Sequence, residues 1–286
     1  MIDKKIIGVV VLNYKDAETT KRMCLKISSY NLINHIVIVD NLSPDDSFSK
    51  LKALKCDKID VIQSDKNGGY SYGNNYGAFY LIEKYNIDVL FFANPDVEFE
   101  EDFVEKVSNI IITGKAVAAS GVMLNRDRKI GINGTQINSY LDDIRECSII
   151  VRRFFKKKVD SFENSGKVIK VEYLSGSLFG IDAKCFWDVQ GFDENVFLYC
   201  EERILGKKFI DRGWEMVIDT SAKYLHLHSV SINKTLKRWE QVNQLYKSRL
   251  YYWEKYGKVG KIKILLLKIC MLYGSLIRKI VYKLNR

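Results

Sequence analysis

The sequence predicts an α/β fold in which a mainly parallel sheet carries helices on both faces. Short, nearly all-apolar segments rich in β-branched residues alternate with helical patterns through the N-terminal half. Each of these segments ends in a polar residue: Asn13, Asp40, Ser64 or Asn94. Strands of a parallel sheet are buried on both faces and therefore read as continuous apolar runs. Ligands bind beyond the carboxyl ends of such strands, so these four positions are the first candidates for chemistry.

The expected elements follow one another along the whole chain. In the N-terminal half, strands at 6–14, 35–40, 59–64 and 87–93 alternate with helices at 19–30, 48–55 and 76–85. In the C-terminal half, we expect a glycine-interrupted strand at 171–181, a short helix at 183–189, a helix at 201–214 and strands at 215–220 and 222–228. The basic stretch at 152–158 is expected to form a loop or the rim of a cleft.

Composition excludes several classes of protein. The chain has 286 residues, of which 47% are hydrophobic and 28% charged, an ordinary globular balance. The net charge is +10, but the basic residues do not interleave with aromatics along a stripe, which excludes nucleic acid as the expected partner. Six cysteines without CxxC spacing indicate free thiols in a reducing compartment. Since the N-terminus has no signal-peptide pattern, we expect a cytoplasmic protein.

The C-terminal tail, residues 258–286, has a different pattern from the rest of the chain. Its apolar stretch is interrupted by Lys268 and is shorter than the roughly 20 residues that span a bilayer. A polar stripe runs along the expected helix, made of Lys261, Lys268, Ser275, Lys279 and Lys283. This pattern is typical of a helix lying in the membrane interface, on the inner face of the cell membrane. The alternative is a helix that packs on the protein's own core or on a second copy in a homodimer.

The segment IDVLFFANPDVEF contains the main candidate for a metal ligand. Its buried strand ends at Asn94, Pro95 interrupts the ladder, and Asp96 projects at the edge of the sheet, where a hard cation could bind. A divalent ion there could hold a diphosphate and neutralise the charge that grows as it departs. The alternative is an Asx turn without a metal.

Two further segments end at the same predicted edge. Asp40 closes the second strand, where a carboxylate can accept hydrogen bonds from a nucleotide base or ribose. The DKNGGYSYGNNYGA segment is expected to form a turn that lets backbone approach a ligand, followed by the start of a helix. Its glycines and asparagines are Asn67, Gly68, Gly69, Gly73, Asn74 and Asn75.

These segments, with others, resemble the family 2 glycosyltransferases of the GT-A fold, in particular their bacterial rhamnosyltransferase-like branch. The matching motifs are VVVLNY, IVIVDNLSPDDS, NGGYSYGNNYG, FFANPDV, YLSGSLFGI, GFDENVFLYCEE and HLHSVS, over about residues 5 to 256. The resemblance implies a GT-A catalytic domain at 1–230, with a nucleotide-binding half at 1–100 and an acceptor-binding half at 101–230. A helical, membrane-associating extension would then occupy 231–286.

The resemblance also implies a nucleotide-sugar donor, a Mg²⁺ or Mn²⁺ ion and inversion at the anomeric carbon. Asp96 would be the remaining carboxylate of the family's DxD metal motif, since Asn94 stands at the first aspartate. Asp40 would contact the nucleoside. The other residues expected on the donor side are Asn13, Asn67, Gly68, Gly69, Asn75 and Asn94.

The motif GFDENVFLYCEE supplies the candidate catalytic base. Inverting transfer needs a group that removes the acceptor's hydroxyl proton, and the family places it second in an acidic pair that opens a helix. That position is Glu202, preceded by Glu201. The alternative is two ordinary helix-start charges. Ile204 replaces the acidic residue usual after the pair. Asp193 and Glu194 belong to an element that resembles an acceptor-side loop, and Glu201 is expected to bind the acceptor with them.

Two histidines are candidates for a further metal ligand. His226 fits the family position that approaches the metal, with His228 as its rival on the same strand face.

The expected function is transfer from dTDP-rhamnose or a UDP-hexose to a lipid-linked glycan in surface polysaccharide synthesis. The alternative is a non-catalytic, nucleotide-binding subunit of a glycan assembly complex. An NAD-dependent oxidoreductase is disfavoured, because the first strand-to-helix turn has no GxGxxG.

Overall fold

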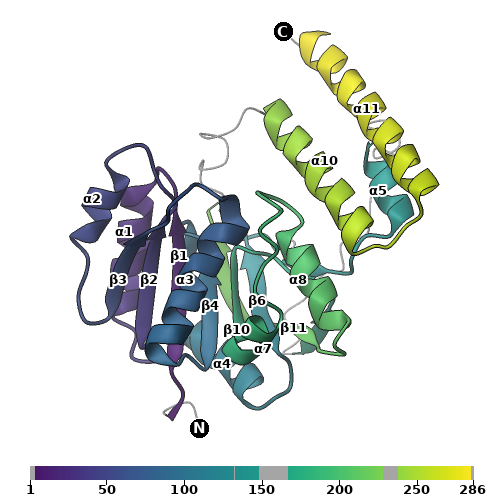
Figure 1. Cartoon of the computed structure of the whole chain (residues 1–286). Coiled ribbons are helices and arrows are strands. Elements are labelled where there is room, and N and C mark those ends of the chain that lie inside the picture. Colours follow the sequence, from purple (N-terminus) through teal and green to yellow (C-terminus); the bar gives the residue numbers. More distant parts are fainter. Residues whose placement is uncertain (1–3, 132, 148–166, 228–237, 285–286) are drawn as a thin grey trace.

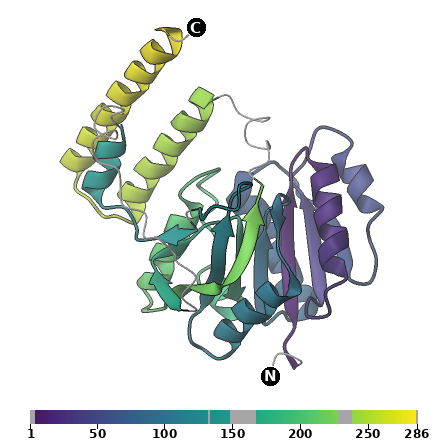
Figure 2. The same ribbon diagram turned by 180° about the vertical axis from the view of Figure 1, so that it is seen from behind.

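The structure, a computed structural model, describes residues 4–131, 133–147, 167–227 and 238–284 (Figure 1). A central sheet carries helices on both faces, and two long C-terminal helices lie at one side of this body, as the views from front and back agree (Figures 1 and 2). The predicted basic stretch at 152–158 and the predicted domain boundary at residue 230 fall outside the described residues.

The described strands fall into one large and one small sheet. Their bounds are β1 Ile7–Asn13, β2 His35–Asp40, β3 Ile59–Gln63, β4 Val89–Ala93, β5 Val97–Glu98, β6 Ala118–Leu124, β7 Gly134–Thr135, β8 Val168–Val171, β9 Tyr173–Leu174, β10 Leu178–Asp182 and β11 Met216–His226. The large sheet has the order β3-β2-β1-β4-β10-β6-β11-β5, with β8 also paired to β11, and β7 pairs with β9 in the small sheet.

The described helices surround the sheet and form the tail. Their bounds are α1 Ala17–Ser28, α2 Ser47–Lys52, α3 Gly69–Tyr85, α4 Glu101–Ile112, α5 Tyr140–Cys147, α7 Ala183–Asp188, α8 Glu201–Ile210, α10 Arg238–Lys255 and α11 Lys261–Leu284.

The first four strands run parallel, as the sequence predicts. The register pairs Asn13 with Asp40, so the polar ends of β1 and β2 meet at one edge. The sheet is nevertheless mixed, because β10 runs antiparallel to both β4 and β6. The two strands expected at 215–220 and 222–228 are one strand, β11, with an irregular register between Asp219 and Lys223.

Two hydrophobic cores lie on the two faces of the sheet. Neighbouring residues of β4 divide between them: Phe91 packs into the core under α1 and α4, and Phe92 into the core under α3, α7 and α8. Both side chains are fully buried. This burial on both faces explains why the strand reads as an unbroken apolar run.

Helix α3 begins at Gly69 rather than near Tyr76, so the prediction for its start was wrong. Gly68 is the N-cap residue and Gly69 opens the helix, while two further glycines of the segment lie inside it, on the face that packs against the sheet. A Cβ at Gly73 would lie 2.3 Å from Leu12 Cδ1, and one at Gly77 would lie 2.6 Å from Val39 Cγ2. These glycines therefore allow α3 to approach β1 and β2 closely.

A third core joins α5, α8, α10 and α11. Its fully buried members include Ile204 of α8 and Leu267 of α11. The C-terminal helices thus pack onto the same helix that begins with the acidic pair. Among the residues described, no helix has the length and apolar character needed to cross a membrane.

The close approach of α3 gives a test of this packing. We expect Gly77→Ala to lower the free energy of unfolding by about 1–3 kcal/mol, because the added methyl overpacks against Val39 and Val10. In an open helix the same change would stabilise by about 1 kcal/mol. Urea denaturation of the full chain measures the difference. Gly260→Ala, where an added Cβ meets nothing within 4 Å, is the matched control. A Gly77→Ala protein as stable as the control contradicts the packing.

Candidate functional site

The carboxyl ends of β1 and β2 are organised by one buried carboxylate. Asp40 is fully buried, and its Oδ2 accepts a hydrogen bond from Asn13 Nδ2 at 2.8 Å. Its Oδ1 accepts from the backbone N–H of Ser43 at 2.9 Å and from Gln63 Nε2 at 3.1 Å. Asp40 therefore links the ends of three neighbouring strands. Its predicted contact with a nucleoside stays a prediction, as does the donor-side role of Asn13, which is also fully buried.

Left-handed backbone follows both strand ends. Lys15 has φ 57° and Leu42 has φ 52°, conformations that cost non-glycine residues of order 1–3 kcal/mol each. The turn at Lys15 is held by its N–H, which donates to Ser43 Oγ at 3.0 Å. Leu42 is exposed and Tyr14 is partly exposed, so both offer apolar surface beside the edge. The sequence analysis did not single out these two residues, although an aromatic directly after the polar end of a strand was an available signal.

The glycine-rich segment packs against the protein itself. Asn67 Oδ1 accepts from Asn41 Nδ2 at 3.1 Å and from the N–H of Gly69 at 3.2 Å. Gly69 has φ 81°, and a Cβ there would lie 2.0 Å from the carbonyl oxygen of Phe197. That oxygen accepts from the N–H of Tyr70 at 2.9 Å. The start of α3 thus holds the segment before α8, and the expected approach of its backbone to a ligand stays a prediction.

Asn75 and Gly68 also serve this packing. The Asn75 amide donates to the carbonyl of Phe192 at 3.0 Å and to Glu194 Oε1 at 2.9 Å. Its Oδ1 accepts from the N–H of Phe192 at 2.9 Å. These bonds give the buried Asn75 a structural role, and its predicted contact with a donor stays a prediction. Gly68 is the N-cap residue of α3, and its N–H donates to the carbonyl of Lys66 at 3.1 Å.

The two candidate metal ligands lie together. Strand β5 pairs antiparallel with the end of β11, setting His226 opposite Val97, and the N–H of Leu227 donates to the carbonyl of Asp96 at 3.0 Å. In this arrangement His226 Nε2 lies 3.4 Å from Asp96 Oδ1, and both side chains are largely buried. Asn94 precedes them, and its N–H donates to the carbonyl of Ser177 at 2.8 Å. His228 lies outside the described residues.

Asp96 and His226 could together bind a divalent ion that is also coordinated by a diphosphate. A carboxylate oxygen and an imidazole nitrogen suit Mn²⁺, whereas Mg²⁺ prefers oxygen alone. Within the described ranges, His, Cys, Asp and Glu form no cluster of three or more that could hold a metal. An ion bound by Asp96 and His226 would therefore need further ligands, which the oxygens of a diphosphate can supply.

The acidic pair opens α8 after two strained residues. Tyr199 and Cys200, the N-cap residue, both have φ 67°. Glu202 is partly buried, and its Oε1 accepts from the N–H of Gly176 at 3.0 Å. Glu201 is 4% exposed, and its Oε2 has no hydrogen-bond partner among the residues described.

Burial governs the charge of this pair. Desolvation raises the pKa of the Glu201 carboxyl well above its usual range, and repulsion by Glu202 adds to the shift. Desolvation also raises the pKa of Glu202, while the hydrogen bond from Gly176 opposes that rise. Because burial raises the pKa of both carboxyls, they bind protons more readily than exposed glutamates do.

Residues 175–177 connect the candidate base with the candidate metal ligands. The N–H of Gly176 bonds Glu202, while the carbonyl of the next residue, Ser177, bonds the N–H of Asn94. Gly176 also accepts from the Tyr70 hydroxyl at 2.6 Å, and a Cβ at Gly176 would lie 2.9 Å from Glu202 Oε1. The structure therefore brings the acidic pair close to the end of β4.

The predicted acceptor-side residues are engaged within the protein. Asp193 Oδ2 accepts from the hydroxyls of Tyr251 at 2.8 Å and Tyr256 at 2.6 Å. Burial works to raise the pKa of Asp193, but these bonds and those from Asn195 prevail and hold it below its ordinary value. Asp193 therefore ties its loop to the C-terminal helices, and its contact with an acceptor stays a prediction. Glu194 pairs with Asn75, and its acceptor role stays a prediction, as does that of Glu201.

Comparison with protein families and curated proteins gives related matches. Residues 8–186 match the family described as "Glycosyl transferase family 2". The chain is 26% identical over 197 residues to the low-salt glycan biosynthesis hexosyltransferase Agl10 of Haloferax volcanii, covering 68% of this chain and 59% of the relative. It is 22% identical over 212 residues to the rhamnosyltransferase WbbL of Escherichia coli, covering 69% and 74%.

Solved structures show the same fold. GalNAc-T7 with UDP, GalNAc and Mn²⁺ matches with a TM-score of 0.58 and 14% identity, over 88% of this chain and 49% of that one. The mannosyltransferase PcManGT of Pyrobaculum calidifontis with GDP-Man and Mn²⁺ matches with a TM-score of 0.59 and 11% identity, over 94% and 73%. The predicted GT-A fold is thereby confirmed. The chain spans about half of the first structure and 59% of the hexosyltransferase.

The buried acidic pair predicts a measurable pH dependence of stability. A carboxyl whose pKa is raised by folding stabilises the fold below the unfolded pKa, about 4.3, and this contribution is lost as pH rises through the folded value. We therefore expect the free energy of unfolding to fall less steeply between about pH 5 and pH 8 in Glu201→Gln than in the unmodified chain. Urea denaturation across this range measures it. Glu83→Gln, at an exposed site on α3, should keep the original slope, and an unchanged slope in Glu201→Gln would refute the burial argument.

Proposed function

Because the chain belongs to glycosyl transferase family 2, we propose that it is an inverting glycosyltransferase that moves a sugar from a nucleotide diphosphate-sugar to a lipid-linked glycan. The observation that carries the proposal is the link through residues 175–177, which joins Glu202 to the strand end beside Asp96 and His226. The relatives' names, a glycan biosynthesis hexosyltransferase and a rhamnosyltransferase, support transfer of a hexose or a rhamnose in glycan synthesis. A UDP-hexose or dTDP-rhamnose as donor and a role in surface polysaccharide synthesis are part of the proposal.

Glu202 acts as the general base in this proposal. It takes the proton from the acceptor hydroxyl as that oxygen attacks the anomeric carbon. A raised pKa makes its carboxylate a stronger proton acceptor, provided that the carboxylate is ionised at the working pH. The hydrogen bond from the Gly176 N–H fixes one carboxylate oxygen and leaves the other to face the substrate.

The donor binds at the carboxyl edge in this proposal. Asp96 and His226 would hold a Mg²⁺ or Mn²⁺ ion there, and such an ion would supply positive charge beside the diphosphate. The turns after β1 and β2, tied together by Asp40, present the apolar surfaces of Tyr14 and Leu42 to the nucleoside. The nucleobase can then stack on or pack against these two side chains, while polar groups of the edge form hydrogen bonds with the ribose.

Two conservative substitutions test the chemistry. We expect Glu202→Gln to lower kcat by at least about 100-fold with nucleotide binding kept, because only the proton acceptor is removed. We expect Asp96→Asn to weaken Mn²⁺-dependent binding of the nucleotide as well as transfer, because a ligand of the ion is lost. Transfer assays with radiolabelled donor and calorimetry measure the two effects.

Matched controls separate these effects from general damage. Asp102→Asn and Glu105→Gln make the same chemical changes at exposed positions of α4 and should leave both quantities unchanged. If Asp96→Asn and Glu202→Gln both keep full activity, the site assignment is wrong.

A non-catalytic nucleotide-binding subunit is the second candidate. The observation that favours it is Ile204, fully buried where the family carries an acidic residue. Calorimetry showing tight Mn²⁺-dependent binding of UDP or dTDP, with no turnover over a panel of donors and acceptors, would support this candidate over an enzyme.

The outer face of α11 supports the membrane part of the proposal. While Ile264, Leu267 and Met271 pack inward, a second apolar face points away from the protein. Its residues recur at the i, i+3 and i+4 positions of one helix face and are all exposed: Ile262, Leu265, Leu266, Ile269, Leu272, Tyr273, Leu276 and Ile280. Leu272 is 72% exposed. A continuous apolar stripe of this kind is typical of a surface that binds a membrane or a partner.

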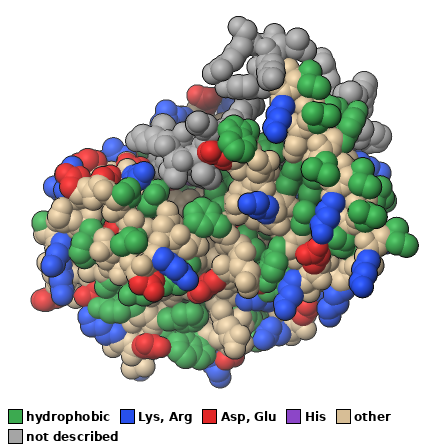
Figure 3. Space-filling view, turned by 45° about the horizontal axis from the view of Figure 1, so that its top comes forward, with side chains coloured by type: hydrophobic (Ala, Val, Ile, Leu, Met, Phe, Trp, Pro, Cys, Tyr) green, Lys and Arg blue, Asp and Glu red, His purple; other side chains and the backbone are tan. Residues whose placement is uncertain are grey.

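Charge favours an anionic bilayer over a second copy. Helix α11 contains no acidic residue, and its basic residues are Lys261, Lys263, Lys268, Arg278, Lys279 and Lys283. Hydrophobic and basic side chains intermingle over the C-terminal helices at the upper right of Figure 3. Two copies meeting through this face would bring like charges together. Anionic lipid instead contributes about 1 kcal/mol for each nearby Lys or Arg.

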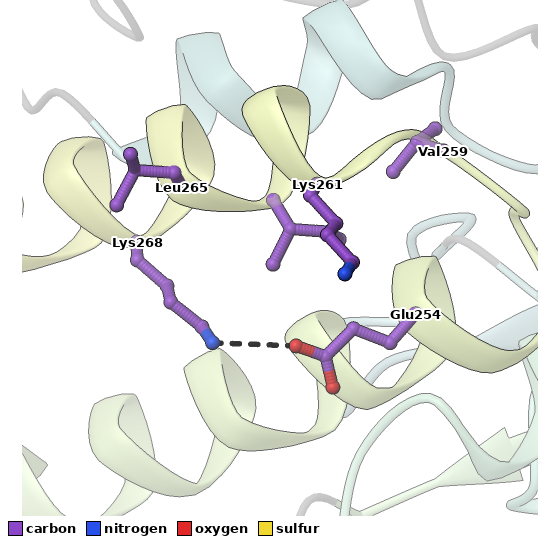
Figure 4. Close-up of a pocket in the computed structure, with 6 residues that line it drawn as sticks. Glu254, Val259, Lys261, Leu265 and Lys268 are labelled. Carbon is purple, nitrogen blue, oxygen red and sulfur yellow. Dashed lines mark ion pairs between the residues drawn. The ribbon is translucent and has the colours of Figure 1, made fainter.

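Part of the predicted polar stripe of α11 lines a groove between α10 and α11. Lys268 lies 3.3 Å from Glu254 of α10, and Lys261 lines the same groove (Figure 4). Leu265 borders this groove and also belongs to the exposed apolar face. Two of the predicted polar residues therefore lie along the groove with α10, and the apolar stripe is left for the bilayer.

Vesicle binding tests the membrane contact. We expect Leu265→Glu/Leu272→Glu to reduce binding to vesicles containing phosphatidylglycerol by about tenfold or more, since burying a Leu contributes about 1.5–3 kcal/mol. Sedimentation with vesicles measures it, and neutral phosphatidylcholine vesicles should bind less of the unmodified chain. Leu25→Glu/Ile130→Glu adds the same charge at other exposed apolar positions and should bind normally. If the α11 variant binds vesicles normally but converts a dimer to a monomer, the face is a subunit interface.

A further inference from the structure

Helix α10 holds the segment that leads into the acidic pair. The two views place α10 beside α8 (Figures 1 and 2). Ser248, which is buried, donates its hydroxyl to the carbonyl of Leu198 at 2.8 Å. Further along the chain, Tyr251 of α10 and Tyr256, which directly follows that helix, donate to Asp193. These bonds fix the segment on the N-terminal side of Tyr199 and Cys200.

A buried ion pair fixes the segment on its C-terminal side. Arg203 Nη1 donates to Asp143 Oδ2 of α5 at 2.6 Å, and Nη2 donates to the carbonyl of Asn138 at 2.7 Å. The guanidinium lies 3.8 Å from the ring centre of Tyr252 of α10. Trp253 Nε1 donates to the same oxygen of Asp143 at 2.7 Å. Because Arg203 and Asp143 are both buried, the interaction is shielded from solvent and geometrically demanding.

The chain's departure from the family pattern has a structural reason here. Arg203 and Ile204 follow the acidic pair where the family typically has other residues, an acidic one at 204. Ile204 is fully buried in the core shared with α10 and α11, and Arg203 reaches α5 and α10. The positions after the pair have become the docking face for the C-terminal helices.

The residues between these two anchors carry backbone strain. Tyr199 and Cys200 both adopt φ 67°, which costs of order 1–3 kcal/mol each in non-glycine residues. Strained backbone persists only where its surroundings determine it. The carbonyl of Phe197 is held by Tyr70 on one side of the strained pair, and α10 supplies the contacts that flank it on both sides.

We infer that α10 is a positioning element of the active site, and that Tyr251, Tyr256 and Arg203 set the orientation of the acidic pair without touching the substrate. This inference rests on the proposed function. Helix α10 fixes the strained turn at Tyr199 and Cys200, and the turn aims the carboxylates of Glu201 and Glu202. The appended helices are then part of the catalytic apparatus as well as the contact with a membrane.

The test removes two hydroxyls and leaves the rings. In Tyr251→Phe/Tyr256→Phe of the full chain we expect kcat to fall about tenfold at saturating donor and acceptor, because small displacements of a catalytic group slow the reaction steeply. The KM for the donor and the calorimetric affinity for the nucleotide should stay within about twofold, since the donor edge is untouched. A merely structural role would alter stability without this split between kcat and KM.

The matched control is Tyr80→Phe/Tyr85→Phe. Tyr85 donates its hydroxyl to the buried Asp60 at 2.7 Å, and Tyr80 bonds Lys84, which also pairs with Asp60. The change removes two hydroxyls from around one buried carboxylate at the far end of α3. We expect a similar loss of stability and an unchanged kcat.

A second variant covers the other anchor. Arg203→Met should lower kcat, with donor KM kept, and Arg203→Lys should restore part of the loss because it can still bond Asp143. If the unmodified chain transfers sugar but the tyrosine pair and Arg203→Met, both folded by circular dichroism, keep full kcat, the positioning role is overturned. If the unmodified chain shows no transfer at all, it is the proposed function that fails.

Discussion

The short ladder between β5 and β11 is the constraint on which the candidate site depends. It pairs Val97 with His226, and its last hydrogen bond joins the N–H of Leu227 to the carbonyl of Asp96. These are backbone bonds, so they bring the two residues side by side, and in this arrangement His226 Nε2 lies 3.4 Å from Asp96 Oδ1. β11 is itself fixed along its length by β6 and β8, and β4 delivers Asn94 from the centre of the sheet. Strands of the main sheet, rather than a flexible loop, therefore set the positions of the candidate ligands.

The sequence predicted the elements whose signals are local and missed features that depend on a neighbour. The strands β1 to β4 were predicted because burial on both faces leaves an apolar run, as at Phe91 and Phe92. The start of α3 was misplaced because a glycine can mark a turn or a close approach, and only the sheet beneath Gly73 and Gly77 decides between them. The antiparallel direction of β10 was missed because an apolar pattern reads the same in both directions. The irregularity after Asp219 made one strand read as two.

The same distinction applies to the site. Asp96 and His226 lie close together, because the turn that contains Asp96 leads into β5, which pairs with the end of β11. Their role as metal ligands stays a prediction. Asn75 and Asp193 were expected to face ligands, and those contacts stay predictions. What the sequence did not predict is that their polar atoms bond Phe192, Tyr251 and Tyr256, partners distant in the sequence. A polar residue in a motif shows only that it needs partners. Which partners it finds depends on tertiary packing, and that is also why Asp143, in a short amphipathic helix, gave no sign of its burial.

Burial and strain at the start of α8 explain why the C-terminal helices share a core with this helix. Glu201 is buried without a hydrogen-bond partner for Oε2 among the described residues, which costs free energy, and the two left-handed residues before it cost more. An isolated helix end would relieve both by turning the carboxyls into water. It is prevented from doing so because Tyr70 holds the chain at Phe197, while Ser248 and Arg203 fasten its two sides to α10 and α5. The apolar contacts of Ile204 with α10 and α11 offset the cost, so the geometry of the acidic pair depends on helices that lie outside the sheet.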